Sequence, residues 1–334
     1  MKKEIILGVD VSKNKLDLCL LTNGSTKPIE MKVIVNQKEK ILNYLIGLDK
    51  NYGKTRILVC LEHTGVYGLA LCMTLQEYEF DYAMVPALEI KNSIGIIRGK
   101  TDQIDALRIA TYAWRFIDKL ILTQIPANQL ILMQELLALR DQNVKMSVQL
   151  QNSLKAHKIA SELLHDDCVV IRIAKQIAMI KNEIKDIEKQ LIAIVDTNPS
   201  IKQNYKLLQS IKGIGPITAI ALILTTQNFN KITDGRKYNS YAGLAPFKCE
   251  SGQMVKRAKV SNIANKNVKR LLHNGACSAI NYDKELNTYY NRKLEEGKPR
   301  MSVLNAIACK LVYRVFAVIK RQTPFVNLYQ NNFA

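Results

Sequence analysis

The sequence lacks cysteines at the spacing of a metal-binding or redox motif. Its 334 residues contain seven cysteines and no C-x-x-C pair: Cys19, Cys60, Cys72, Cys168, Cys249, Cys277 and Cys309. Scattered single thiols argue against both a disulfide framework and a structural zinc site. We therefore expect reduced, mostly buried cysteines in a cytoplasmic protein.

Signals for export or membrane insertion are also lacking. The N-terminal apolar stretch is interrupted at Asp10, too early for a signal peptide. The longest uncharged run, from Ile214 to Asn230, contains glycine, proline and polar residues and is not expected to span a membrane. Neither terminus carries a basic amphipathic helix with an aromatic anchor. These absences predict a protein with no membrane partner.

Positive charge is what the sequence has in excess. Lys and Arg total 48 against 29 Asp and Glu, a formal net charge of +19. From residue 201 onward there are 22 basic and 6 acidic residues, whereas the first 200 residues contain 26 and 23. A field of this size attracts polyanions. We therefore predict a nucleic-acid-binding surface in the last third of the chain, and charge alone does not separate DNA from RNA because both present phosphates.

Residues 1–127 have the pattern of an α/β domain. Three strands are expected within residues 4–36, then a helix at 37–48, a buried strand that ends on Glu62 and a short strand near 81–86. A helical pattern begins near residue 100. Antiparallel-looking strands followed by alternating helices and strands predict a layered fold of the ribonuclease H type.

The rest of the chain has helical patterns. Residues 128–198 form long apolar and charged repeats with almost no glycine, which predict a helical hairpin or a coiled-coil arm. An arm of this kind usually sets oligomerisation or spans a ligand. Residues 199–334 predict a mainly α domain with glycine-rich turns, and this domain carries the charge excess.

Four carboxylates lie where the predicted fold brings strand ends and a helix start together. Asp10 and Glu62 each end a strand, whereas Asp102 and Asp105 lie three apart at the start of a helix and point to one face. Oxygen ligands suit Mg²⁺ or Mn²⁺, and such clusters support two-metal phosphodiester cleavage. Taken singly, each residue is explained at least as well as a turn former, a helix cap or a solvated charge. Their joint placement in a strongly basic chain favours a metal site.

The segment LLQSIKGIGPITAIALIL has the form of a helix-hairpin-helix. Gly213 and Gly215 allow a tight turn whose backbone N–H groups can meet a phosphate, and Lys212 adds charge. An ordinary turn between packed helices explains the pattern equally well. The basic residues that follow make phosphate contact the better interpretation: Lys248, Lys256, Arg257, Lys259, Lys266, Lys269 and Arg270.

Ser251 lies in a Glu-Ser-Gly turn among these basic residues. Its hydroxyl stands where a phosphate is expected, but no adjacent histidine supplies a base, so activation would have to come from a metal or a neighbouring charge. A serine in such a turn is by default a turn residue. From the residues alone, catalysis by Ser251 is the weaker alternative.

These motifs together resemble the DEDD transposases of the insertion-sequence one-hundred-ten family, relatives of the Piv DNA invertases. GVDVSKNKLDL, LEHTGVYG and GKTDQIDALRIA are similar to that family's RuvC-like domain, with Asp10, Glu62, Asp102 and Asp105 at its acidic positions. IKGIGPITA and YAGLAPFKCESG are similar to its transposase domain. The resemblance covers essentially the whole chain, including the helical arm.

The resemblance implies a recombinase that cuts and rejoins DNA at element ends and target, directed by a structured noncoding RNA. It also implies a dimer or tetramer, a bound Mg²⁺ or Mn²⁺, and attack on the DNA phosphate by a serine that corresponds to Ser251. Glu250 stands where relatives often carry a small polar residue, so Ser240 is the second candidate. Two other functions stay open: a RuvC-like structure-selective nuclease that needs only the carboxylates, and a nucleic-acid-binding protein without activity.

Overall fold

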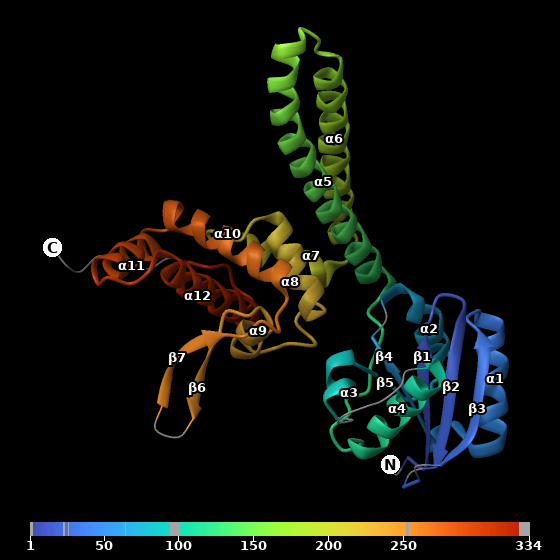
Figure 1. The fold of residues 1–334 in the computed structure, drawn as a ribbon. Helices are drawn as coiled ribbons and strands as arrows, with labels where there is room; N and C mark the ends of the chain where they lie inside the picture. The colour runs from blue at the N-terminus through green and yellow to red at the C-terminus, as the bar shows by residue number, and fades with distance from the viewer. Residues whose placement is uncertain are drawn as a thin grey trace. The chain divides into compact units, whose positions relative to one another are not determined.

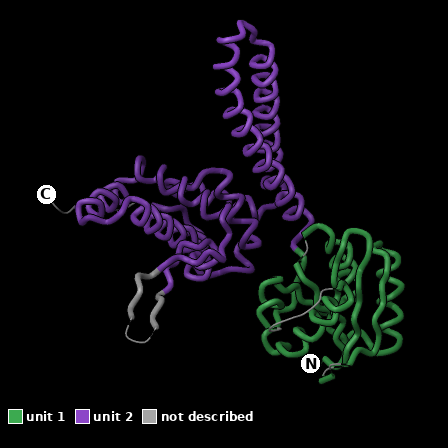
Figure 2. The backbone as a smooth tube through the Cα atoms, viewed as in Figure 1, with its two compact units in different colours: residues 1–125 green, residues 126–334 purple. Residues whose placement is uncertain are grey.

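The computed structural model describes residues 3–22, 24–25, 27–63, 65–93, 101–251 and 254–326, without the side chains of residues 248–251 and 254–258. The chain forms two compact units, residues 1–125 and 126–334 (Figure 2).

Unit 1 is built on a five-stranded mixed sheet (Figure 1). The strand order is β3-β2-β1-β4-β5; β1, β2 and β3 pair antiparallel, whereas β4 pairs parallel with both β1 and β5. The strands are β1 Ile5–Val11, β2 Lys15–Thr22, β3 Pro28–Val35, β4 Ile57–Glu62 and β5 Tyr82–Val85. The helices are α1 Lys38–Tyr52, η1 Lys54–Arg56, η2 Gly65–Gly68, α2 Leu69–Glu77, α3 Ala87–Ser93 and α4 Asp102–Arg115. The predicted order of strands and helices is confirmed.

The alternation of side chains along β1 divides unit 1 into two cores. Leu7 and Val9 face α1 and α2, whereas Ile6 lies on the opposite face with the buried residues of α4. Both faces of β1 and β4 are covered, which is why these strands are apolar along nearly their whole length. The sheet with helices on both sides confirms the predicted α/β class.

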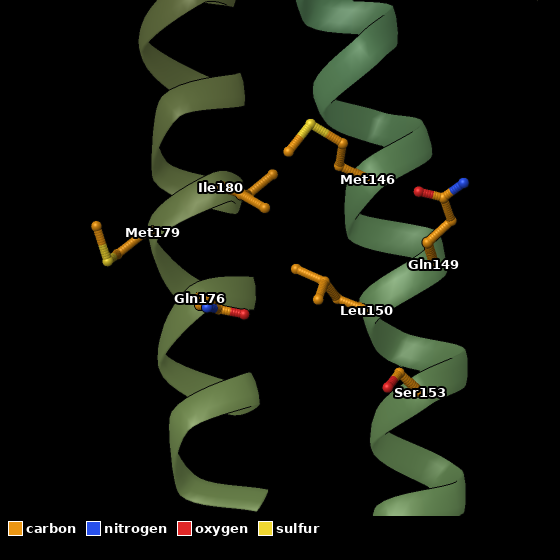
Figure 3. A pocket seen from close by; sticks show the side chains of 7 residues that line it. All are labelled: Met146, Gln149, Leu150, Ser153, Gln176, Met179 and Ile180. Carbon is orange, nitrogen blue, oxygen red and sulfur yellow. The ribbon is translucent and has the colours of Figure 1, made fainter. Parts of the chain in front are cut away.

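Unit 2 begins with two long helices, α5 Asn128–Leu164 and α6 Cys168–Thr197, which lie side by side (Figure 1). A cavity of about 540 Å³ opens between them; Met146, Leu150, Met179 and Ile180 line it with three polar side chains (Figure 3). None of the predicted site residues lines this cavity. The helical hairpin is present, and its supercoiling remains a prediction.

The rest of unit 2 packs around one core that includes the base of the hairpin, through Met133, Leu191 and Val195. Its helices are α7 Pro199–Gln209, α8 Pro216–Thr226, α9 Gly235–Tyr241, α10 Lys266–Tyr282, α11 Lys284–Glu295 and α12 Arg300–Arg321. The hairpin and the C-terminal helices thus share a unit, and the predicted boundary near residue 198 stays a prediction.

Two features of unit 2 were not expected. A two-stranded antiparallel hairpin, β6 Pro246–Ser251 and β7 Met254–Val260, stands among the helices. Within the described part of the chain, α12 is the one helix long and apolar enough to cross a membrane by length and composition. Half of that stretch is buried, and Ile307, Leu311 and Val315 lie in the core. A core helix passes the same test, so this helix is weak support for a membrane span.

Candidate active site

The sheet register places Asp10 and Glu62 at neighbouring strand ends. Gly8 pairs with Cys60 and Val9 with Leu61 in the parallel ladder of β1 and β4, so Asp10 and Glu62 come next in register. Side chains two residues apart on a strand point to the same face. Gly8 and Cys60 face α4, and the two carboxylates therefore lie on that face as well.

A close approach of helix to sheet brings in the other two carboxylates. A β-carbon built on Gly8 would lie 2.4 Å from the carbonyl oxygen of Ala106 and 2.5 Å from the backbone nitrogen of Ala110, so only glycine allows this contact. Thr101 caps the N-terminus of α4, since its hydroxyl accepts a hydrogen bond from the backbone of Ile104 at 3.3 Å. The first turn of α4 carries Asp102 and Asp105.

The electrostatics of Asp10 reflect its acidic neighbours. Burial is the largest cause that raises the pKa of Asp10 from 3.8 to about 6, and the negative charges of Asp105, Asp102, Asp17 and Glu62 contribute to the same rise, in that order. The other three predicted acidic residues therefore act electrostatically on Asp10. Their mutual repulsion is the kind that a bound divalent cation relieves.

Two basic residues already neutralise part of this cluster. Lys15 Nζ lies 2.8 Å from Asp102 Oδ2 and 3.1 Å from Asp17 Oδ2, and the hydrogen bond to Asp102 is the main cause that raises the pKa of Lys15. Arg108 Nη1 lies 2.5 Å from Asp105 Oδ1. Among the described residues, no three His, Cys, Asp or Glu side chains are placed to hold a metal ion. The oxygen-only donor set fits Mg²⁺ or Mn²⁺, but Asp102 and Asp105 would have to turn from their cationic partners to hold it.

Asp17 is a member of the cluster that the sequence did not single out. It pairs with Asp10 across β1 and β2, and its side chain is 3% exposed. In the sequence KLDLCLLT it reads as one polar residue in a strand. Because Asp17 lies directly opposite Asp10 in the antiparallel register, both carboxylates lie on the α4 face.

The glycines of the predicted helix-hairpin-helix have different roles. Gly213 adopts a left-handed backbone (φ +92°), and a β-carbon on it would lie 2.5 Å from the carbonyl oxygen of Gly275 in α10. Gly215 precedes α8, is exposed, and has open space around it, and Lys212 is exposed as well. Gly213 therefore serves packing, whereas Gly215 and Lys212 are free to meet a phosphate.

The basic residues after this turn differ in their surroundings. Lys259 and Lys266 are exposed, and Lys269 is half-buried. Arg270 lies 3.5 Å from Asp141, a buried carboxylate of α5 that also pairs with Arg140. Arg270 thus joins α10 to the base of the hairpin in addition to its predicted contact with phosphate.

The predicted nucleophile ends strand β6. The Ser251 backbone pairs with Met254 at the end of the hairpin, and the Ser251 side chain lies outside the described residues. The same holds for three basic side chains of the prediction, Lys248, Lys256 and Arg257. Ser240, the second candidate, is half-buried in α9.

Comparison with known proteins identifies relatives along most of the chain. The transposase IS116/IS110/IS902 family model matches residues 205–291, and a transposase model of the IS110 DEDD type matches residues 7–157. The pilin gene-inverting protein of Moraxella lacunata is 23% identical over 326 residues, which are 96% of this chain and 97% of that protein. An uncharacterized 43.6 kDa protein of insertion element IS110 from Streptomyces coelicolor is 27% identical over 157 residues, 47% of this chain and 38% of that one.

Among solved structures, T. thermophilus RuvC in complex with a Holliday junction substrate is similar at 11% identity. The similarity covers 36% of this chain and 99% of that one, with a TM-score of 0.29. Of the two family matches, one spans all four predicted carboxylates and the other spans Gly213 and Ser251. The chain belongs to the IS110-type family of transposases, which are enzymes that cut and join DNA.

Proposed function

We propose that this protein is a transposase or site-specific recombinase that uses a carboxylate-bound divalent metal and a serine nucleophile. The observation that carries the proposal is the electrostatic effect of Glu62, Asp102 and Asp105 on Asp10, inside the region that matches the transposase family. These four residues would hold Mg²⁺ or Mn²⁺. When bound, such a cation supplies charge stabilisation at a phosphodiester and activation of an oxygen nucleophile.

The chain's own residues prepare this site before any cation binds. Lys15 and Arg108 hold Asp102 and Asp105 by ion pairs, which limits repulsion within the cluster. Buried Asp17 places a further carboxyl group next to Asp10. The cluster therefore favours a cation of high charge over a monovalent one.

Ser251 is the proposed nucleophile. Its oxygen would form a bond to the DNA phosphorus while the bond to the leaving deoxyribose oxygen breaks; the serine hydroxyl loses a proton and the leaving oxygen gains one. One phosphodiester replaces another, so the linkage keeps the free energy needed for rejoining. DNA at element ends and target, a structured noncoding guide RNA and assembly as a dimer or tetramer follow from the resemblance and belong to the same proposal. The cytoplasmic location expected from the scattered cysteines belongs to it as well.

The test is a search for a covalent protein–DNA adduct. Purified protein is mixed with Mg²⁺, element-end DNA and the cognate RNA, and resolved under denaturing conditions. An adduct that is lost in Ser251→Ala and in Asp102→Ala, but kept in Ser302→Ala at an exposed serine of α12, supports the proposal. If the adduct is lost in Ser240→Ala but still forms in Ser251→Ala, Ser240 is the nucleophile.

Other outcomes select the alternatives. Free cleaved ends in both parent and Ser251→Ala would identify a structure-selective nuclease. Binding of DNA without cleavage under any of these conditions would identify a nucleic-acid-binding protein without activity.

A further inference from the structure

Unit 2 contains a second cavity, of about 390 Å³, that the proposed chemistry does not use. It lies between α7, the loop after α8 and the end of α12. Its polar lining consists of neutral side chains, one hydroxyl and five amides: Ser200, Gln203, Asn204, Asn228, Asn230 and Gln322. Phe229 and Ile319 complete the wall, so no charged residue lines the cavity in the described part of the chain. Such a site selects a neutral ligand that both donates and accepts hydrogen bonds.

Four of the polar side chains form a fixed support. Gln322 Nε2 donates to Asn204 Oδ1 at 3.3 Å, Asn204 Nδ2 donates to Asn228 Oδ1 at 2.8 Å, and Asn228 Nδ2 donates to Ser200 Oγ at 2.9 Å. Asn204 is 8% exposed and anchors this chain of bonds in the interior. The orientation of the Asn228 amide at the cavity wall is therefore set before a ligand arrives.

Two further amides are free to bind. Among the described residues, the side chains of Gln203 and Asn230 make no hydrogen bond within the protein, and both are exposed. Each offers one acceptor oxygen and two donor hydrogens at the mouth of the cavity. The support and the free amides together make a preformed polar site.

The loop that carries Asn228 and Asn230 has an uncommon backbone. Gln227, Asn228 and Phe229 have consecutive positive φ values of 50°, 55° and 66° without a glycine. Non-glycine residues rarely adopt this backbone region, and such strained residues cluster at binding sites. Phe229 holds the loop in place by an edge-on contact with Phe316, at 5.3 Å between ring centroids.

We propose that this cavity binds an unpaired nucleobase of the nucleic acid on which the protein acts. Asn and Gln amides match the donor and acceptor pattern of base edges, and unpaired bases expose those edges. The chain neighbours of the lining residues are basic at Lys231, Lys320 and Arg321, where they suit the phosphates on either side of the base, whereas the neighbouring Lys202 pairs with Asp196. The proposal rests on the proposed function for its choice of nucleic acid as partner, and RNA and DNA share the chemistry.

The test compares oligonucleotides with and without bases. Fluorescein-labelled single strands of mixed sequence, and matching strands made abasic, are titrated with the full chain in RNA and DNA forms. We expect the Gln203→Ala/Asn230→Ala double variant to bind the base-containing strand roughly tenfold more weakly, about 1.4 kcal/mol, and the abasic strand as the parent does. Asn291→Ala, an exposed amide of α11, is the matched control.

The outcomes separate this proposal from the function above. If the double variant loses affinity equally for base-containing and abasic strands, or if the parent binds both equally, the cavity does not bind a base. Neither result contradicts the proposed recombinase function. A parent that binds neither RNA nor DNA, with or without bases, contradicts the proposed function itself. A loss confined to one of the two strand types identifies the source of the base. Because both substituted side chains are exposed and make no internal bonds, the double variant should melt with the parent.

Discussion

Gly8 of β1 and Ala110 of α4 lie so close that a β-carbon on Gly8 would stand 2.5 Å from the Ala110 backbone nitrogen. This contact sets the distance of α4 from the sheet. The first turn of the same helix carries Asp102 and Asp105, whose charges act on Asp10 two residues after Gly8. A glycine without chemistry of its own thus determines whether the carboxylates share a site.

Substitution of Gly8 tests this relationship. We expect Gly8→Ala to lower the free energy of unfolding by about 1–3 kcal/mol, because the added methyl group displaces α4. The rate of DNA cleavage should also fall at temperatures where the variant is still folded, because the carboxylates of α4 move with the helix. Gly47→Ala is the matched control: Gly47 lies in α1 with open space around it, and alanine there should stabilise by about 0.5–1 kcal/mol. Equal behaviour of the two variants in thermal melting and cleavage would contradict this.

The raised pKa of Asp10 predicts how stability depends on pH without metal. Well below pH 3.8 the carboxyl is protonated in both the folded and the unfolded chain, so it does not change the free energy of unfolding. As pH rises from 3.8 to about 6 the unfolded chain ionises first, so stability falls, and the penalty remains at higher pH. In EDTA, Asp10→Asn removes the penalty and should melt above the parent at pH 7 but with it at about pH 3. A difference that stays constant with pH would show that Asp10 titrates normally.

Lys15 pairs with Asp102, so a divalent metal bound by Asp102 would have to displace it. We therefore expect Lys15→Gln to bind Mn²⁺ several-fold more tightly than the parent, measured by calorimetry or by the rise in melting temperature with Mn²⁺ concentration. Lys13→Gln removes an exposed charge from the same turn and serves as the control. Unchanged or weaker Mn²⁺ binding in Lys15→Gln would mean that Lys15 orients the carboxylates rather than competing for them.

The two glycines of the α7–α8 turn should separate packing from DNA contact. Gly213→Ala places a methyl group against Gly275 in a left-handed backbone, so we expect a loss of about 2 kcal/mol or more in unfolding free energy. Gly215→Ala has open space and should leave stability within about 0.5 kcal/mol. If Gly215 meets a phosphate, its variant should bind DNA more weakly at unchanged stability. Similar melting temperatures of the two variants would contradict the packing role of Gly213.

Local patterns in the sequence predicted much of unit 1. The apolar runs around Val9 and Leu61 gave the buried strands, because a strand covered on both faces is apolar along its whole length. Asp10 and Glu62 marked the strand ends, and the three-residue spacing of Asp102 and Asp105 placed them on one helix face. The hairpin β6–β7 was not predicted, because its strands include five charged residues and little apolar alternation.

The sequence by itself predicted the strands of unit 1, the helical hairpin and four acidic candidate residues, because each depends on patterns within a few residues. Only the tertiary structure decided that Asp17 joins the cluster, that Lys15 and Arg108 neutralise it, and that Gly213 packs on Gly275. Those relationships depend on strand register and on how closely helices approach their neighbours. Both are set by contacts between residues far apart in the chain, which no local pattern contains.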